Sequence, residues 1–287
     1  MRIGDHDLEL PGFGDYGLAA LKLLIFAAFI VLAWALINRI TSFDDHHALF
    51  EERNTAYALQ RAGLVFGQAL ALTSLINYRS SNDLSDFAWL IGGGIWITGL
   101  LLGLRIVAPM IINAGSTELE RTVSVGLVRG SFYAASGLVI GAGLSGWAPS
   151  LATGLASTFV FTVLGIAVLI GVYVGNGHLP PYRLSARIRE GNVAAAFIAS
   201  GFMIALGLVL RYAIAGDFEG WGQGLVEFTL TAVLALGLFY LLCLAVDRWI
   251  ISNATLIEVV RGGHEVAAAV VAVALVAIAI GISAVAI

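Results

Sequence analysis

Eight long apolar runs, separated by short polar segments, constrain this chain more than any other feature. A run of about 20 apolar residues is long enough for a helix to cross a hydrocarbon core of about 30 Å. We therefore predict an all-α integral membrane protein with eight transmembrane helices. The predicted helices cover residues 17–38, 54–76, 87–111, 122–144, 150–174, 192–213, 224–251 and 264–286.

The composition agrees with lipid as the solvent. Only 12% of the residues are charged and 59% are hydrophobic, whereas soluble domains carry about 25% charged residues. The net charge of −4 and the lack of any basic run argue against a nucleic-acid partner. A single cysteine, Cys243, excludes an intrachain disulfide.

The two halves of the chain resemble each other at a nearly constant offset. Glu52 and Asn54 answer Glu190 and Asn192, and Gly63 answers Gly201. We divide the chain into a first four-helix repeat, residues 1–148, and a second, residues 149–287. Because four is an even number of spans, both repeats insert the same way up and are parallel.

Basic residues concentrate on one side of this topology. The loops after the first, third, fifth and seventh helices, with their helix ends, hold eleven of the fifteen basic residues: Arg39, Arg53, Arg61, Arg105, Arg121, Arg129, Arg183, Arg187, Arg189, Arg248 and Arg261. Cytoplasmic loops carry the excess of Lys and Arg. We therefore expect cytoplasmic motif loops and both termini outside.

A short motif recurs where charged loops turn into apolar helices. Its clearest copy runs from Glu190 through Gly191 and Asn192 to Ala196, with fainter copies around Glu52 and Glu265. Asn is a favoured N-cap, and the helix dipole favours a carboxylate nearby. Helix capping by Glu52, Glu190 and Gly191 is one interpretation. The other is a polar ring at a pore mouth, since intramembrane polar groups are often functional; its candidates are Asn54, Gln68, Asn192 and Glu265.

Several polar residues lie inside the predicted spans. Arg61 and Arg129 lie about two turns from helix starts, where we expect the side chains to reach back toward the interface. Gln68 lies deeper and is expected to bond a neighbouring helix. No acidic residue falls near the middle of a span, which argues against a proton or sodium relay.

Glycines four apart recur in the apolar runs and predict close helix packing. The pairs are Gly63 and Gly67, Gly99 and Gly103, Gly137 and Gly141, and Gly171 and Gly175, with Gly201 as the counterpart of Gly63. For Gly92-Gly93-Gly94 two interpretations stay open. The run is either a flexible point or a place where another backbone comes close.

No pattern indicates catalysis, a metal or a cofactor. Asp44-Asp45-His46-His47 contains ligand residue types, but they are adjacent in a loop and lack the i, i+4 spacing of a helical metal site. We expect a solvated loop there. No nucleophile elbow, P-loop or dinucleotide fingerprint occurs, so we do not expect an enzyme.

The pattern Glu-Gly-Asn-x-Ala-x-Ala at residues 190–196, with Gly201 nine residues after the Asn, resembles the bacterial inner-membrane family labelled domain of unknown function 350. Members look like four-helix units that are often duplicated, and this chain would hold two units. The first unit departs from the pattern with Arg53 in place of glycine, and the end of the second has Glu265 where Asn is expected. The resemblance implies an inner-membrane protein whose biochemical role is not settled.

Two functions follow from these features. The leading one is a channel-like protein or transporter for an unidentified ion or small solute, with its pathway between the two repeats. The alternative is a non-transporting scaffold or complex subunit that docks a cytoplasmic partner through its loops; an enzyme acting on lipid is more distant. The expected partners are the lipid bilayer and either a second copy of the chain or an unidentified protein. Uninterrupted helices argue against the broken-helix type of transporter.

Overall fold

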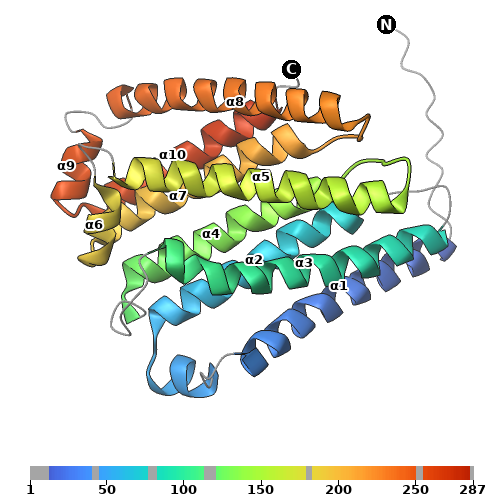
Figure 1. Cartoon of the computed structure of the whole chain (residues 1–287). Coiled ribbons are helices and arrows are strands. Elements are labelled where there is room, and N and C mark those ends of the chain that lie inside the picture. Colours follow the sequence, from blue (N-terminus) through green and yellow to red (C-terminus); the bar gives the residue numbers. More distant parts are fainter. Residues whose placement is uncertain are drawn as a thin grey trace, which may run out of the picture.

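The computed structural model describes residues 13–40, 45–76, 83–112, 121–178, 183–249 and 255–284. These residues are helical apart from the connections, with no strand among them (Figure 1). The long helices are α1 Phe13–Ile40, α2 Thr55–Ile76, α3 Asp83–Ile111, α4 Val123–Gly143, α5 Leu151–His178, α7 Val193–Ile214, α8 Trp221–Trp249 and α10 Glu265–Ala284. Three short ones are η1 His47–Glu51, α6 Leu184–Arg189 and α9 Leu256–Arg261.

All eight long helices of the described chain are long and apolar enough to cross a membrane, which confirms the predicted fold class. The third span begins earlier than predicted, at Asp83. Asp86 is buried inside it, and Lys22 of α1 donates to its carboxylate at 3.0 Å. The predicted ends at residues 251 and 286 lie outside the described residues.

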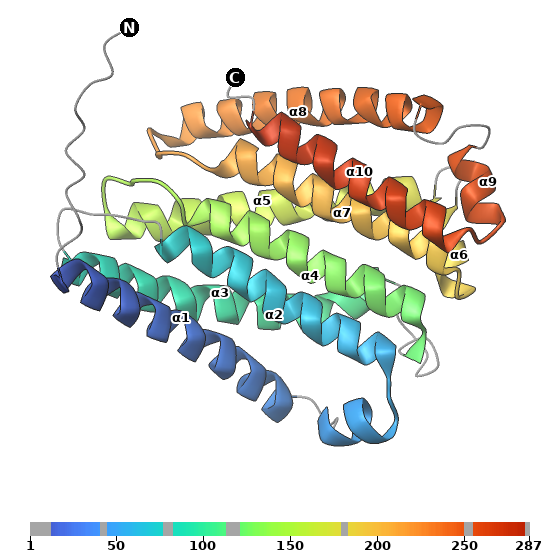
Figure 2. The same cartoon turned by 180° about the vertical axis from the view of Figure 1, so that it is seen from behind.

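The helices form two layers. α2, α4, α7 and α10 lie side by side in a row, since α2 packs on α4, α4 on α7 and α7 on α10 (Figure 2). The second layer consists of α1, α3, α5 and α8, which pack against the row (Figure 1). α4 and α7 lie inside the row and are the most buried of the spans. In their most apolar stretches of 18 residues, 89% and 72% of the residues are buried. The repeats therefore meet mainly along α4 and α7.

Glycines bring the helices of the row into backbone contact. A Cβ on Gly126 would lie 2.5 Å from Ala56 Cα, and one on Gly201 would lie 2.5 Å from Ala272 Cα. The same close approach places Gly63 and Gly67 of α2 against Gly130 and Tyr133, and Gly137 and Gly141 of α4 against Gly67 and Ala71. Side chains larger than hydrogen do not fit between these backbones.

Other glycines lie where nothing packs. Among the described residues, no heavy atom lies within 4 Å of a Cβ built on Gly99, Gly103, Gly171 or Gly175. The prediction of close packing is therefore wrong for these two pairs, because α3 and α5 turn these faces outward. Within the triple glycine, Gly93 lies against the Leu75 side chain and Gly94 against the Phe29 ring, so side chains and not a backbone approach there.

The lengths and starting positions of the helices also repeat between the two halves of the chain. α1, α2 and α3 have 28, 22 and 29 residues, and so do α5, α7 and α8. Each of these pairs begins at one constant offset along the chain, for example at Phe13 and Leu151. α4 and α10, which begin at Val123 and Glu265, lie further apart by about one helical turn. The last span therefore departs from the nearly constant offset that the sequence predicts.

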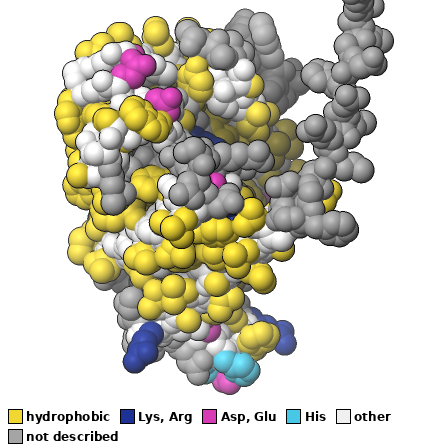
Figure 3. Space-filling model, turned by 90° about the vertical axis from the view of Figure 1, so that its right-hand side faces the viewer, with side chains coloured by type: hydrophobic (Ala, Val, Ile, Leu, Met, Phe, Trp, Pro, Cys, Tyr) yellow, Lys and Arg dark blue, Asp and Glu magenta, His cyan; other side chains and the backbone are white. Residues whose placement is uncertain are grey.

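Apolar side chains cover the outside of the helices. Large hydrophobic residues of the outer layer are exposed, among them Leu24, Val31, Met110, Leu155 and Leu241. Figure 3 looks onto the end of the molecule away from α6 and α9, and hydrophobic side chains dominate this view. In a bilayer the sides of these outer helices contact lipid tails.

Candidate functional site

The motif at residues 190–196 forms a sharp corner between α6 and α7. Gly191 has a left-handed backbone, with a φ of 85°. Its N–H donates to Ile188 O at 3.1 Å and that of Asn192 to Arg187 O at 3.0 Å, so α6 ends in a Schellman motif. Asn192 Oδ1 then accepts the Ala195 N–H at 2.8 Å and caps α7. One asparagine thus closes one helix and opens the next.

The corner occurs again before α2 and α10. Arg53 has a φ of 50°, and Asn54 Oδ1 accepts the Tyr57 N–H at 3.0 Å. Gly263 has a φ of 66°, and the N–H of His264 donates to Val259 O at 3.0 Å. Arg53 therefore stands where glycine stands in the other copies.

The backbone corrects one position of the motif. His264, not Glu265, takes the place of the asparagine, because His264 follows the left-handed Gly263 and its carbonyl accepts the first helical bond from Ala268. Glu265 is the first helical residue of α10 and is exposed. The sequence pattern pointed to Glu265 because the spacing of the last span differs from that of the others.

The four ring candidates do not come together. Asn54 caps α2 and Gln68 lies within it, and α4 separates α2 from α7 in the row. Gln68 lies fourteen residues beyond Asn54, or about 20 Å at the helical rise of 1.5 Å per residue. Asn192 Nδ2 donates to Val260 O of α9 at 2.8 Å, which ties the corners before α7 and α10 together.

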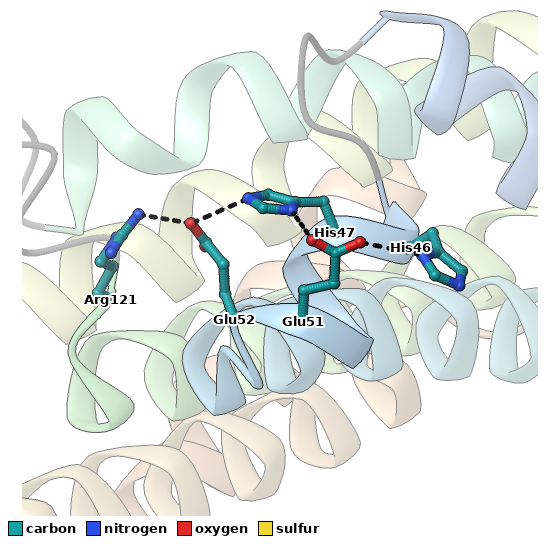
Figure 4. Close-up of polar contacts among 5 residues, drawn as sticks. All are labelled: His46, His47, Glu51, Glu52 and Arg121. Atoms are coloured by element: carbon teal, nitrogen blue, oxygen red, sulfur yellow. Dashed lines mark hydrogen bonds and ion pairs between the residues drawn. The ribbon is translucent and has the colours of Figure 1, made fainter.

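The acidic residues of the motif make exposed ion pairs. Glu52 binds Arg121 at 2.9 Å, from the loop before α2 to the start of α4. Glu190 lies 3.8 Å from Arg187. Figure 4 shows Glu52 and Glu51 approached by His47 at 3.5 and 2.7 Å. Among the described residues no three His, Cys, Asp or Glu side chains gather as for a metal ion.

A buried polar group lies just below the first corner. Arg61 is 1% exposed, and both Arg61 and Tyr57 donate to the carboxylate of Asp45. The Arg61 guanidinium lies 4.5 Å from the centre of the Trp34 ring. Asp45 is thus an ion-pair partner instead of part of a solvated loop. Arg61 stays inside the protein instead of reaching the interface, because its counter-ion folds down onto it. Asp44 lies outside the described residues.

Arg129 and Gln68 are also buried. Arg129, 2% exposed, donates to Ile112 O at 3.5 Å and also does not extend to the interface. Gln68 Nε2 donates to Thr98 Oγ1 at 2.8 Å, and Thr98 in turn donates to Gly94 O at 2.8 Å. Gln68 Oε1 has no partner among the described residues. This is the interhelical bond expected for Gln68.

A cavity of about 710 Å³ opens at the end of the molecule away from the corners. α3, the end of α4, α5, the end of α7 and α8 line it. Gly93 and Trp96 of its wall lie within about one turn of Thr98. The cavity therefore lies where the two repeats meet, and the residues that line it include neither Gln68 nor Thr98.

At seven positions where the first repeat has buried or partly buried polar residues, the second repeat has a different kind of residue. At the matching positions it has apolar residues or, in one case, the opposite charge. The replacements are Arg183 for Asp45, Ala195 for Tyr57, Ala199 for Arg61, Leu206 for Gln68, Leu236 for Thr98, Cys243 for Arg105 and Val271 for Arg129. Buried charged or amide side chains of the described residues all belong to the first repeat. Sequence reasoning missed this asymmetry, although an aligned comparison of the two halves contains the signal.

These features define a polytopic membrane protein built from two tandem four-helix repeats, of which the first has a polar interior. The chain belongs to the family described as Domain of Unknown Function (DUF350), whose model matches residues 10–144 and again residues 150–286. The predicted resemblance, with its two copies, is confirmed. No curated protein and no solved structure gives a significant match.

Proposed function

We propose that the protein is a non-catalytic transport protein of the bacterial inner membrane, channel-like or a carrier, with its solute-handling residues inside the first repeat. The observation that carries the proposal is the difference between the repeats. The second builds the same helices with Ala199, Leu206 and Leu236 where the first has Arg61, Gln68 and Thr98. The fold therefore does not require these polar groups.

Buried polar groups in a membrane cost free energy, about 2.5 to 3.5 kcal/mol for a central Arg on insertion scales. A cost that the fold does not demand favours a functional role. The polar residues along α2 and α3 support a pathway within α1 to α4. The contact between α4 and α7 is a poorer place for one, because a Cβ on Gly207 would lie 2.9 Å from Ala135 Cα.

Flux through purified protein in liposomes tests the proposal. We would impose salt gradients and follow the membrane potential with a fluorescent dye, for wild type and for the double variant Gln68→Leu and Thr98→Leu, which copies the second repeat. We expect flux for the wild type and its loss in the variant, with an unchanged or higher Tm, since a dry Leu pair fits this fold. The matched control, Leu206→Gln in the second repeat, keeps the flux.

A scaffold is the second candidate. The short helices α6 and α9 present exposed charged residues at the corner end, including Arg189, Glu190 and Arg261. Such a surface suits a soluble cytoplasmic partner. A scaffold gives no flux above empty liposomes in any salt, and the variant with Gln68→Leu and Thr98→Leu then has the same flux as the wild type. This result would overturn the transport proposal.

A further inference from the structure

Three arginines of the first repeat lie at one depth. Arg61 and Arg129 are the seventh residues of α2 and α4, and Arg105 is the seventh residue from the end of α3. At 1.5 Å per residue, each lies about 10 Å below the corner end of its helix. Their counterparts in the second repeat are Ala199, Val271 and Cys243.

Arg105 lies near the ion pair of Arg61 and Asp45. Arg105 is partly buried and lies within electrostatic range of Arg61, Asp45, Tyr57 and Tyr133. Of these groups only Asp45 is an acid that ionises near neutral pH. Among these described groups, two guanidinium groups and one carboxylate therefore lie within electrostatic range of one another.

Arg61 also has donors to spare. Its Nη2 bonds Asp45, whereas Nε and Nη1 have no hydrogen-bond partner among the described residues. Guanidinium groups bind anions through such forked N–H donors, and charge-assisted bonds are the strong ones. Among the described residues, the site therefore has more positive charge and donors than negative charge and acceptors.

The ligand has to be small. Arg61 is 1% exposed, and the Trp34 ring lies over its guanidinium, so a lipid headgroup held at the bilayer surface does not reach it. The carboxylate of Asp45 reaches it from the segment before η1. Asp45 occupies the place in which a free anion would bind.

We infer that Arg61 and Arg105 bind a small inorganic anion, for which the carboxylate of Asp45 stands in as a tethered competitor. A tethered group competes at an effective concentration in the millimolar range. An anion from solution therefore binds once Asp45 moves away. That the anion is also the transported solute rests on the proposed function. That the anion binds at this site does not.

Anion-dependent thermal unfolding of the full chain tests the site. We would follow tryptophan fluorescence at constant ionic strength, replacing gluconate by chloride, nitrate or phosphate. Asp45→Asn removes the competitor and should unfold at a lower Tm in gluconate. At least one of the three anions should restore it, with a midpoint concentration about tenfold lower than for the wild type.

Two variants control this measurement. The double variant Asp45→Asn and Arg105→Gln should lose the recovery, because one of the two guanidinium groups that bind the anion is gone. Glu52→Gln, which breaks the exposed pair with Arg121 and leaves the site intact, should show the same weak anion dependence as the wild type. If no anion restores Asp45→Asn, or if either control responds equally, the site does not exist. If Asp45→Asn yields no folded protein, the anion must raise the Tm of the wild type and not of Arg105→Gln.

Flux and binding separate the two proposals. Anion binding without flux in liposomes keeps the site and overturns the transport function. Flux without anion binding keeps the transport function and overturns the site.

Discussion

Single residues determine how closely the helices approach. Gly137 on α4 lies against the backbone of Gly67, whereas Gly171 on α5 has open space among the described residues. The two glycines look alike in sequence, since each begins a pair with a four-residue spacing. Only the partner helix distinguishes them, and a partner is a property of the fold.

Replacing these glycines by alanine should have opposite effects. Gly137→Ala forces two backbones apart and should destabilise the protein by about 3 kcal/mol, the upper range for overpacking. Gly171→Ala should be neutral or stabilising by up to about 1 kcal/mol, because alanine is the better helix former. Thermal unfolding in detergent measures both. Equal losses would mean that α4 is not held by backbone contact.

The left-handed corner residue offers a second comparison. Arg53 has a φ of 50° where the second repeat has Gly191 with a φ of 85°. A left-handed conformation costs about 1 to 2 kcal/mol for a residue with a Cβ. Arg53→Gly should therefore raise stability by about 1 kcal/mol, and Gly191→Ala should lower it by a similar amount. Their Tm values check this, and a drop for Arg53→Gly would contradict it.

At the scale of the element, long helices follow from local sequence and short ones do not. The eight spans were predictable because apolar length alone specifies them. The helices η1 and α6 have only 5 and 6 residues, too few for a periodic pattern. The pairing of Asp45 with Arg61 joins residues sixteen positions apart across a loop, so no spacing rule indicates it. The sequence predicts the capping role of the corner motif. In the copy before α10, however, it points to Glu265, whereas His264 takes the position of the asparagine.

The corners should differ in strength because, among the described residues, the Asn192 corner also bonds the corner before α10. Asn54→Ala removes one cap, at a cost of about 1 kcal/mol. Asn192→Ala also leaves Val260 O without its 2.8 Å bond and should cost about 1 kcal/mol more. Asn192→Asp keeps the capping oxygen but loses the donor, so it should fall between wild type and Asn192→Ala. Equal Tm values for the alanine variants at the two corners would show that the bond to Val260 contributes nothing.

For the whole molecule, the repeats place the three corners, before α2, α7 and α10, at one end of the helix bundle. We expect this end to be cytoplasmic, since it carries most of the basic residues. In a Cys243→Ser background, Arg261→Cys lies at the corner end and Glu219→Cys at the other. A membrane-impermeant thiol reagent should label Glu219→Cys in spheroplasts and Arg261→Cys only after lysis. The reverse pattern would invert the topology.

The row of α2, α4, α7 and α10 also has a consequence for biosynthesis. No two neighbours in the row are consecutive spans, because an outer helix separates each pair along the chain. As the ribosome delivers spans in order, the glycine face of α2 has no helix packed on it until α4 is inserted. α4 in turn lacks its second neighbour in the row until α7 is inserted. The row therefore grows by one member for every second span inserted. The first repeat is complete before the second repeat can dock, so the half with the polar interior is the template on which the apolar half assembles.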